Sequence, residues 1–125
     1  MKSTVVTGLP EDGSPLEWAT IGHGTLYTSQ APIRPDGSIE DGPMSAQAAQ
    51  TFANLAQTLR AAGGTVDDVT QVIVYLTDKG DFPEMNAAYK AAFARPYPNR
   101  ATIIVSDLMV PGARVEVIAY AAIAS

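Results

Sequence analysis

Gln71-Val72-Ile73-Val74-Tyr75-Leu76 is apolar at nearly every position, with β-branched residues at its centre. Two later segments share this property, Thr102-Ile103-Ile104-Val105 and Val115-Glu116-Val117-Ile118-Ala119-Tyr120. β-branched residues favour strands, and a strand that is apolar on both of its sides is covered on both faces of its sheet. These three segments therefore predict a sheet with neither broad face left to water.

Two amphipathic helices flank the first of these strands. The earlier helix has Ser45 as its N-cap candidate and ends at Gly63-Gly64, a C-cap signal. Its apolar positions recur at helical spacing: Ala48, Phe52, Leu55, Leu59 and Ala62. The later helix starts with the capping-box pattern of Asp81 and Glu84. Its apolar stripe consists of Phe82, Met85, Tyr89 and Phe93. Each pattern predicts a helix with one face suited to packing on a sheet.

The remaining strands lie at the two ends of the chain. Trp18 to Ile21 and Thr25 to Ser29 form a predicted hairpin around the turn His23-Gly24. Two further strands are expected at Arg100 to Val105 and at Arg114 to Ile123. The first hairpin and the last two strands thus enclose the helix–strand–helix segment.

This element order predicts one fold class. Strand–strand, helix, strand, helix, strand–strand is typical of an α+β domain with a single sheet and two helices packed on one face. We expect one such domain over residues 1–125. Two helices cover only one face, and an exposed apolar sheet would aggregate. The other face is therefore expected to meet another subunit, so the pattern predicts an oligomer of unspecified size.

Charge and residue usage exclude several kinds of site. The formal net charge is -5, there is no cysteine, and the single histidine is His23. A phosphate-backbone binder needs clustered Lys and Arg, so nucleic acid is not an expected partner. Cysteine nucleophiles and thiolate zinc sites are excluded, while a Ser-His-Asp triad or a His-rich metal site would depend on His23. Because His23 reads as a turn residue, no metal site is expected.

Membrane and export signals are also missing from the sequence. No apolar run approaches the ~20 residues of a membrane span. Met1 to Leu9 is too short and too polar for a signal peptide. We therefore expect a cytoplasmic protein without a membrane partner.

Two charged residues occupy strand positions where apolar ones are expected. Arg100 begins one strand and Glu116 lies inside another. A charge in a buried strand is costly unless it is paired or used. If the two strands are antiparallel neighbours, both charges lie near one face or edge of the sheet. Two interpretations remain open: an Arg–Glu ion pair, within the chain or at a subunit interface, and a functional site.

Five groups of short motifs follow one another along the chain. They are Leu26-Tyr27-Thr28-Ser29-Gln30-Ala31-Pro32; Asn54 to Gly63 with Asp67-Asp68-Val69; Leu76-Thr77-Asp78 with Asp81-Phe82 and Met85-Asn86-Ala87-Ala88-Tyr89; Tyr97-Pro98-Asn99-Arg100-Ala101-Thr102; and Val115-Glu116-Val117-Ile118-Ala119. In this order they resemble the motifs of the Rid (reactive intermediate deaminase) family, in register from about Trp18 onward. Each motif is weak alone, and their combination makes the resemblance specific.

The resemblance implies a fold, an assembly and a reaction. The fold is chorismate-mutase-like, and the assembly is a homotrimer with three clefts between subunits. The reaction is hydrolysis of enamine or imine intermediates such as 2-aminoacrylate to 2-oxo acids and ammonia, without a cofactor. The family's carboxylate-binding arginine falls on Arg100 and its water-directing glutamate on Glu116. The small residue and backbone amides that help to hold the carboxylate fall on Thr28 and Ser29.

The sequence departs from the family pattern in the expected cleft. Leu16 stands where the family often has a tyrosine that lines the cleft, and Thr102 stands where it often has cysteine. Both are expected to contact the substrate, through a changed cleft wall. A non-catalytic module that binds small carboxylates in the same cleft is the alternative. Ribonuclease activity, an old label in this family, does not suit an acidic chain.

Overall fold

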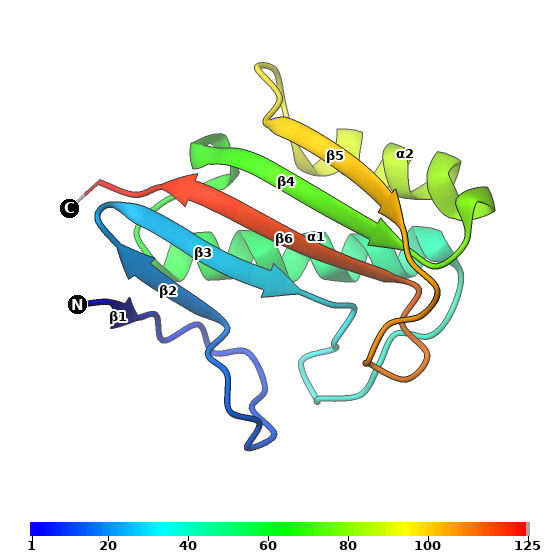
Figure 1. The fold of residues 1–125 in the computed structure, drawn as a ribbon, viewed down its shortest axis with the longest axis horizontal. Coiled ribbons are helices and arrows are strands. Elements are labelled where there is room, and N and C mark those ends of the chain that lie inside the picture. Colours follow the sequence, from blue (N-terminus) through cyan, green and yellow to red (C-terminus); the bar gives the residue numbers. More distant parts are fainter. Residues whose placement is uncertain (125) are drawn as a thin grey trace.

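The computed structural model describes residues 1–124, which form one mixed sheet with two helices on one face (Figure 1). The strands are β1 (Ser3–Thr4), β2 (Ala19–Gly22), β3 (Thr25–Gln30), β4 (Val69–Leu76), β5 (Asn99–Ile104) and β6 (Val115–Ala122). The helices are α1 (Met44–Ala61) and α2 (Phe82–Ala92), and short 3₁₀ turns cover Val66–Asp68 and Lys79–Asp81. The predicted α+β class is therefore confirmed.

Strand order places β6 and β4 at the centre of the sheet. The order is β1-β2-β3-β6-β4-β5, and β6 pairs antiparallel with both β3 and β4. The edge strand β5 runs parallel to β4, because the connection between them passes through α2. The conjecture that the last two strands are neighbours is wrong, since β4 lies between β5 and β6. The turn between β2 and β3 is as expected, with positive φ at both His23 (52°) and Gly24 (76°).

The ends of the helices differ in part from the sequence-based expectation. α1 begins at Met44 after Pro43, which caps it without a side-chain hydrogen bond, so Ser45 is not the N-cap. Its C-terminus is as predicted, with Gly63 at a φ of 85°. The Asp81 side chain makes no cap bond on α2. Asp81 instead forms an ion pair with Arg114 at 3.3 Å, so the capping-box prediction is wrong.

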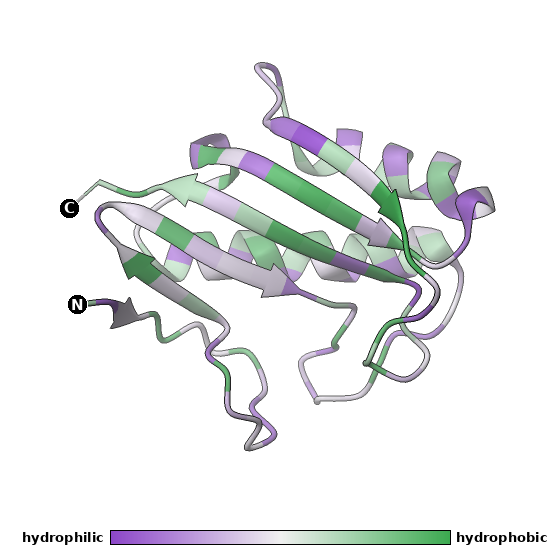
Figure 2. Ribbon diagram, in the orientation of Figure 1, coloured by the Kyte–Doolittle hydropathy of each residue, from purple (hydrophilic) through white to green (hydrophobic). Residues whose placement is uncertain are grey.

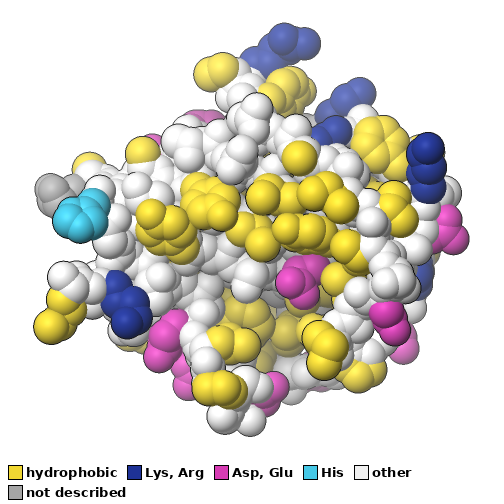
Figure 3. Space-filling view, in the orientation of Figure 1, with side chains coloured by type: hydrophobic (Ala, Val, Ile, Leu, Met, Phe, Trp, Pro, Cys, Tyr) yellow, Lys and Arg dark blue, Asp and Glu magenta, His cyan; other side chains and the backbone are white. Residues whose placement is uncertain are grey.

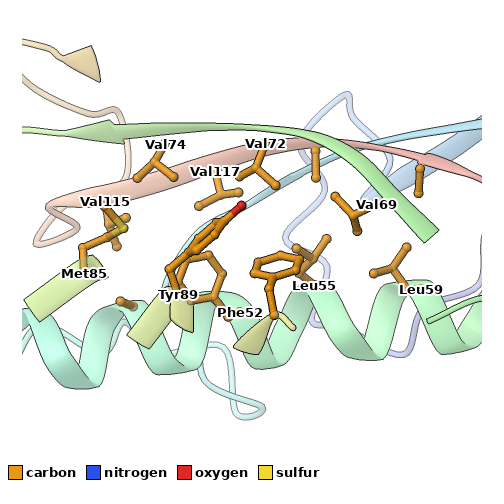
Figure 4. Close-up of a cluster of buried hydrophobic side chains, with 14 of the residues drawn as sticks. Phe52, Leu55, Leu59, Val69, Val72, Val74, Met85, Tyr89, Val115 and Val117 are labelled. Atoms are coloured by element: carbon orange, nitrogen blue, oxygen red, sulfur yellow. The ribbon is translucent and has the colours of Figure 1, made fainter. Parts of the chain in front are cut away.

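The hydrophobic core lies between the helices and the sheet (Figure 4). Side chains from α1, α2, β4 and β6 meet there, among them Leu55, Met85, Val72 and Val117, all fully buried. Each strand side chain comes from every second position, as alternation across a pleated strand requires. Phe82 is an exception to the predicted stripe of α2, because it remains 37% exposed.

Among residues 1–124, no helix covers the opposite side of the sheet, which we call the open face. Its central side chains are Tyr27, Ile73, Tyr75, Ile103, Ile118 and Tyr120, with Glu116 among them. Apolar residues run along the middle of β4 and β6 (Figure 2), and hydrophobic side chains form a band across this face (Figure 3). In the single chain Tyr27 is 46% exposed and Ile103 42% exposed. A band of this kind is typical of an interface.

Among residues 1–124, neither helix is long and apolar enough to cross a bilayer.

Candidate functional site

Arg100 and Glu116 lie on different strands and on opposite faces of the sheet. Arg100 pairs in register with Val72, whose side chain is buried under the helices. Glu116 pairs with Tyr75 on the open face. Paired residues on neighbouring strands point to the same face, so the two charges point away from each other. An ion pair between them within one chain is therefore excluded.

Arg100 lies against the aromatic side chains of α2. Its Cζ is 4.4 Å from the centre of the Tyr89 ring and 5.7 Å from that of Phe82. Within residues 1–124 its guanidinium makes no hydrogen bond or ion pair. It borders a shallow hollow of ≈ 360 Å³, the Arg100 hollow, lined by Asn86, Tyr89, Lys90, Tyr97, Pro98 and Arg100. The arginine is thus oriented while its N–H groups stay available.

Glu116 lines a second and larger hollow, at the end of the open face. This Glu116 hollow has a volume of ≈ 520 Å³. Much of its wall is apolar and includes Leu16, Trp18, Ile33, Met109 and Val110. Its polar side chains include Ser29 and Glu116. An apolar concave site with a few polar groups is the usual form of a small-molecule site.

Burial changes the acidity of Glu116. The carboxyl is half-buried, and this desolvation raises its pKa above the ordinary value for glutamate. No ion pair compensates the carboxylate within residues 1–124. A carboxyl with a raised pKa is suited to proton exchange nearer to neutral pH.

Polar side chains of α1 hold the walls of the Glu116 hollow. Asn54 Nδ2 donates to the carbonyl oxygens of Ala31 at 3.2 Å and Ile33 at 2.8 Å. Gln47 Nε2 donates to Gly112 O at 3.1 Å, and Gln47 Oε1 accepts from the backbone N–H of Arg114 at 2.9 Å. Both side chains are buried, and a buried amide is stable only when bonded. The loops that precede α1 and β6 are fixed in this way.

The N-terminal segment forms another wall of the same hollow. Trp18 Nε1 donates to Pro10 O at 2.8 Å and so ties this segment back on itself. Leu16 lies in the wall and is 61% exposed. A leucine held open to solvent at the mouth of an apolar hollow is available to touch a bound molecule.

The other predicted site residues do not all line one of these two hollows. Ser29 lines the Glu116 hollow, but the neighbouring Thr28 side chain points into the core, where it donates to Trp18 O and accepts from Gln30 Nε2. The Thr28 side chain therefore cannot line this hollow. Thr102 lies two residues after Arg100 on the same side of β5, and it lines neither hollow. In one chain, Leu16, Ser29 and Glu116 come together and Arg100 stays apart from them.

Several residues that line the Glu116 hollow or contact Arg100 are not evident from sequence patterns. Met109 and Trp18 line the Glu116 hollow, and Phe82 with Tyr89 contacts Arg100. Met109, 94% exposed in a loop, carries no periodic signal. The buried amide of Asn54 could have been found, because a polar residue on the apolar side of a helix needs a partner.

Comparison with known proteins gives a consistent result across most of the chain. A sequence model of the family described as endoribonuclease L-PSP matches residues 15–123. The protein mmf2, mitochondrial, of Schizosaccharomyces pombe is 31% identical over 88% of this chain and 89% of its own. A 2-iminobutanoate/2-iminopropanoate deaminase of Dermatophagoides farinae is 36% identical over 61% of this chain and 59% of its own.

Solved structures share the whole fold. RidA from the Antarctic bacterium Psychrobacter sp. PAMC 21119 superposes with a TM-score of 0.89 at 31% identity, over 97% of this chain and 99% of its own. TdcF of Escherichia coli, solved with bound serine, superposes with a TM-score of 0.88 at 26% identity. That match covers 98% of this chain and 99% of TdcF.

Proposed function

Since the chain belongs to the endoribonuclease L-PSP family, which includes the RidA proteins, we propose that it hydrolyses reactive imines and enamines of amino acids to 2-oxo acids and ammonia. One relative is named for deamination of 2-iminobutanoate and 2-iminopropanoate. TdcF holds serine, an amino acid whose carboxylate is of the kind an arginine recognises. The observation that carries the proposal is the guanidinium of Arg100, oriented by aromatic rings and without an anionic partner in residues 1–124.

The proposed site is formed between two subunits of a homotrimer. Arg100 and Glu116 point to opposite faces of one sheet, so a site that uses both takes them from different chains. The apolar band of the open face supports such an assembly, because packing against another subunit would remove it from water (Figure 3). In each cleft, Arg100 of one subunit then faces Glu116, Ser29 and Leu16 of its neighbour.

Substrate binding in this cleft begins with the carboxylate. The planar fork of Arg100 matches a carboxylate in a bidentate contact. This contact fixes the neighbouring imine carbon, and the substrate side chain is left to the apolar wall around Leu16. Holding the reacting carbon at a fixed place beside a bound water removes part of the entropic barrier.

The chemical step requires a water molecule and a group that exchanges protons. An enamine first takes a proton at carbon to become the imine. Water then adds to the imine carbon while Glu116 accepts a proton from it, and the pair of electrons of the C=N double bond moves to nitrogen. Glu116 returns this proton to the nitrogen, which gives a carbinolamine. The C–N bond then breaks as the hydroxyl oxygen forms the C=O double bond, and Glu116 transfers the hydroxyl proton to the departing nitrogen, which gives the 2-oxo acid and ammonia. The raised pKa of Glu116 suits both proton transfers.

A non-catalytic carboxylate-binding module is the second candidate function. Leu16 favours it, because it supplies no hydrogen bond in the cleft wall where relatives often carry a tyrosine. Such a module would bind 2-oxo acids with Arg100 and would not release ammonia. The nuclease named in the family description is not proposed for this chain, because its net charge is -5.

The cellular location stays a prediction. The expectation from the sequence is the cytoplasm, and one relative carries the word mitochondrial in its name. The reaction proposed here requires only water as a second substrate, so it is compatible with either compartment.

Imine hydrolysis in a coupled assay tests the proposal directly. An amino-acid oxidase would generate imines from a panel of amino acids, and a carbonyl-trapping reagent would capture imine that escapes hydrolysis. The wild-type protein should lower the trapped fraction and speed ammonia release, whereas Arg100→Ala should not. Binding of 2-oxobutanoate without any gain in ammonia release would favour the binding module. A wild-type protein that neither binds 2-oxobutanoate nor hydrolyses any imine of the panel would refute the proposed function.

A further inference from the structure

We propose that Phe82 and Tyr89 are positioning residues that hold the guanidinium of Arg100 by its flat surface and leave its N–H edge free for the substrate carboxylate. We call this arrangement the aromatic clamp. It rests on the proposed function, and it concerns residues that the proposed chemistry does not itself use.

The clamp comes from one face of α2. Phe82 and Tyr89 are seven residues apart, which is two helical turns, so their side chains lie on the same side of the helix. Arg100 Cζ is 4.4 Å from the Tyr89 ring centre and 5.7 Å from the Phe82 ring centre. Both distances are within the ≈ 6 Å range of a cation–π contact.

The two rings have different supports. Tyr89 is only 4% exposed and packs against Phe52 and Phe93, with ring centres 5.6 Å and 4.5 Å away. Figure 4 shows Tyr89 and Phe52 together within the core. Phe82 begins α2 and is 37% exposed. Tyr89 is therefore a fixed support, whereas Phe82 can be changed with little effect on the core.

Aromatic rings orient Arg100 without occupying its N–H groups, whereas a carboxylate partner would occupy them. An acidic partner would orient the arginine by occupying the N–H groups of its edge, which are the groups that bind a carboxylate bidentately. A ring attracts the cation through its face and accepts none of these in-plane bonds. Within residues 1–124 no acidic side chain pairs with Arg100. The clamp thus fixes the arginine and keeps its full binding capacity.

Substitution of Phe82 tests the clamp in the intact oligomer. Phe82→Leu keeps an apolar side chain of similar size and removes the ring, so KM for the imine and the dissociation constant of 2-oxobutanoate should each rise about two- to fivefold. kcat should change little, because the lost contact acts on the bound carboxylate in the ground state and the transition state alike. Phe82→Trp restores a ring and should restore KM.

A double-mutant cycle separates action through Arg100 from a general effect. In the Arg100→Ala background, Phe82→Leu should add no further loss of kcat/KM, because the residue that it positions is gone. An equal loss of kcat/KM in both backgrounds would overturn the clamp. If the wild type binds 2-oxobutanoate well and the Phe82→Leu variant binds it equally well, the clamp is also overturned.

An NMR measurement makes the clamp independent of turnover. Ring currents should shift the Arg100 Nε–H resonance, and Phe82→Leu should reduce that shift while Phe82→Trp keeps it. An unshifted resonance in the wild type would overturn the clamp even if imines are hydrolysed. If the resonance is shifted but the wild type neither binds 2-oxobutanoate nor hydrolyses imines, the proposed function fails, and the clamp's role in substrate binding fails with it.

Discussion

Arg100 and Glu116 extend from opposite faces of the sheet, on strands that β4 separates. Two strand spacings and an offset of three residues put their Cα atoms roughly 14 Å apart. A substrate with a carboxylate next to its imine carbon is much smaller than this separation. One chain therefore cannot apply both groups to such a substrate, and the proposed site takes them from two chains.

Mixed assemblies should recover activity from two inactive variants. Arg100→Ala and Glu116→Gln would each be nearly inactive alone, because every cleft lacks one group. In a trimer refolded from an equal mixture, about a quarter of the clefts should combine intact Arg100 from one variant with intact Glu116 from the other. Ammonia release should then reach about a quarter of the wild-type rate. Mixed trimers as inactive as the parents would contradict a site shared between subunits.

Loss of Arg100 should affect binding far more than stability. Arg100→Ala removes a bidentate charged contact worth roughly 2–4 kcal/mol, so kcat/KM should fall about thirty- to a thousandfold. Stability should fall by only about 1 kcal/mol, the scale of a cation–π contact. Chemical denaturation and imine kinetics on the same samples provide the comparison. A destabilisation of about 3–5 kcal/mol would instead indicate a buried ion pair formed across subunits.

The sequence predicts the fold better than it predicts the arrangement of charges. Continuous apolar strands and two helical stripes are repeated local signals, so the sheet, the helices and the uncovered face follow from them. Strand order is a long-range property. The parallel pairing of β4 with β5 depends on the α2 connection, and this pairing inserts β4 between Arg100 and Glu116.

Only part of the candidate site can be predicted from the sequence, for physical reasons. Ser29 and Leu16 line the same hollow as Glu116, and their contact with a substrate stays a prediction. The Thr28 side chain is turned into the core by strand alternation. The resemblance identifies Arg100 as the expected carboxylate-binding residue, but only the folded structure shows which rings contact it. The sequence pattern predicts Phe82 as a core residue, because apolar periodicity cannot distinguish a buried ring from one that contacts a cation.

The raised pKa of Glu116 should make stability depend on pH in a defined direction. In the folded protein the carboxyl keeps its proton at pH values where the unfolded chain has lost it. The stabilisation is therefore complete below the ordinary glutamate pKa and is lost as the pH rises through the raised pKa of the folded state. Glu116→Gln cannot ionise, so its melting temperature relative to wild type should increase over this window and then level off. Thermal melts between about pH 4 and 8 measure this difference.

The pH experiment needs a control variant, and one outcome would contradict the expected direction. Glu17→Gln is the matched control for the loss of one carboxylate, because Glu17 is exposed whereas Glu116 is half-buried. The contradicting outcome is a melting temperature of Glu116→Gln that falls relative to wild type as the pH rises. That result would mean that the fold stabilises Glu116 as an anion, opposite to the direction expected from its burial.

Leu16 should control which substrates fit the cleft. Leu16→Tyr inserts a larger side chain into the wall of the Glu116 hollow, so turnover of imines from leucine or phenylalanine should fall relative to the imine from alanine. Leu16→Ala enlarges the hollow and should change the ratio in the opposite direction by severalfold. Because Leu16 is 61% exposed, melting temperatures should change little. Equal ratios in all three proteins would show that this wall does not contact the substrate side chain.

Assembly should depend on the centre of the open face. Ile118 lies there between Ser29 of β3 and Ile73 of β4, so another subunit that packs on this face would bury it. Ile118→Glu would place an unpaired charge in that interface at a cost of several kcal/mol, enough to separate the subunits. Sedimentation should show wild type near three times 13.1 kDa and the variant as a monomer.

The same variant connects assembly with activity. In Ile118→Glu the Arg100 and Glu116 hollows of each chain remain, but they no longer face those of a neighbour, so imine hydrolysis should be lost with the trimer. Ala49→Glu adds the same charge at an exposed position of α1, where residues of α1 and α2 line a hollow away from the open face, and it should change neither property. A folded Ile118→Glu monomer that still hydrolyses imines at the wild-type rate would place the whole site within one chain. The separation of Arg100 from Glu116 would then exclude one of them from the chemistry.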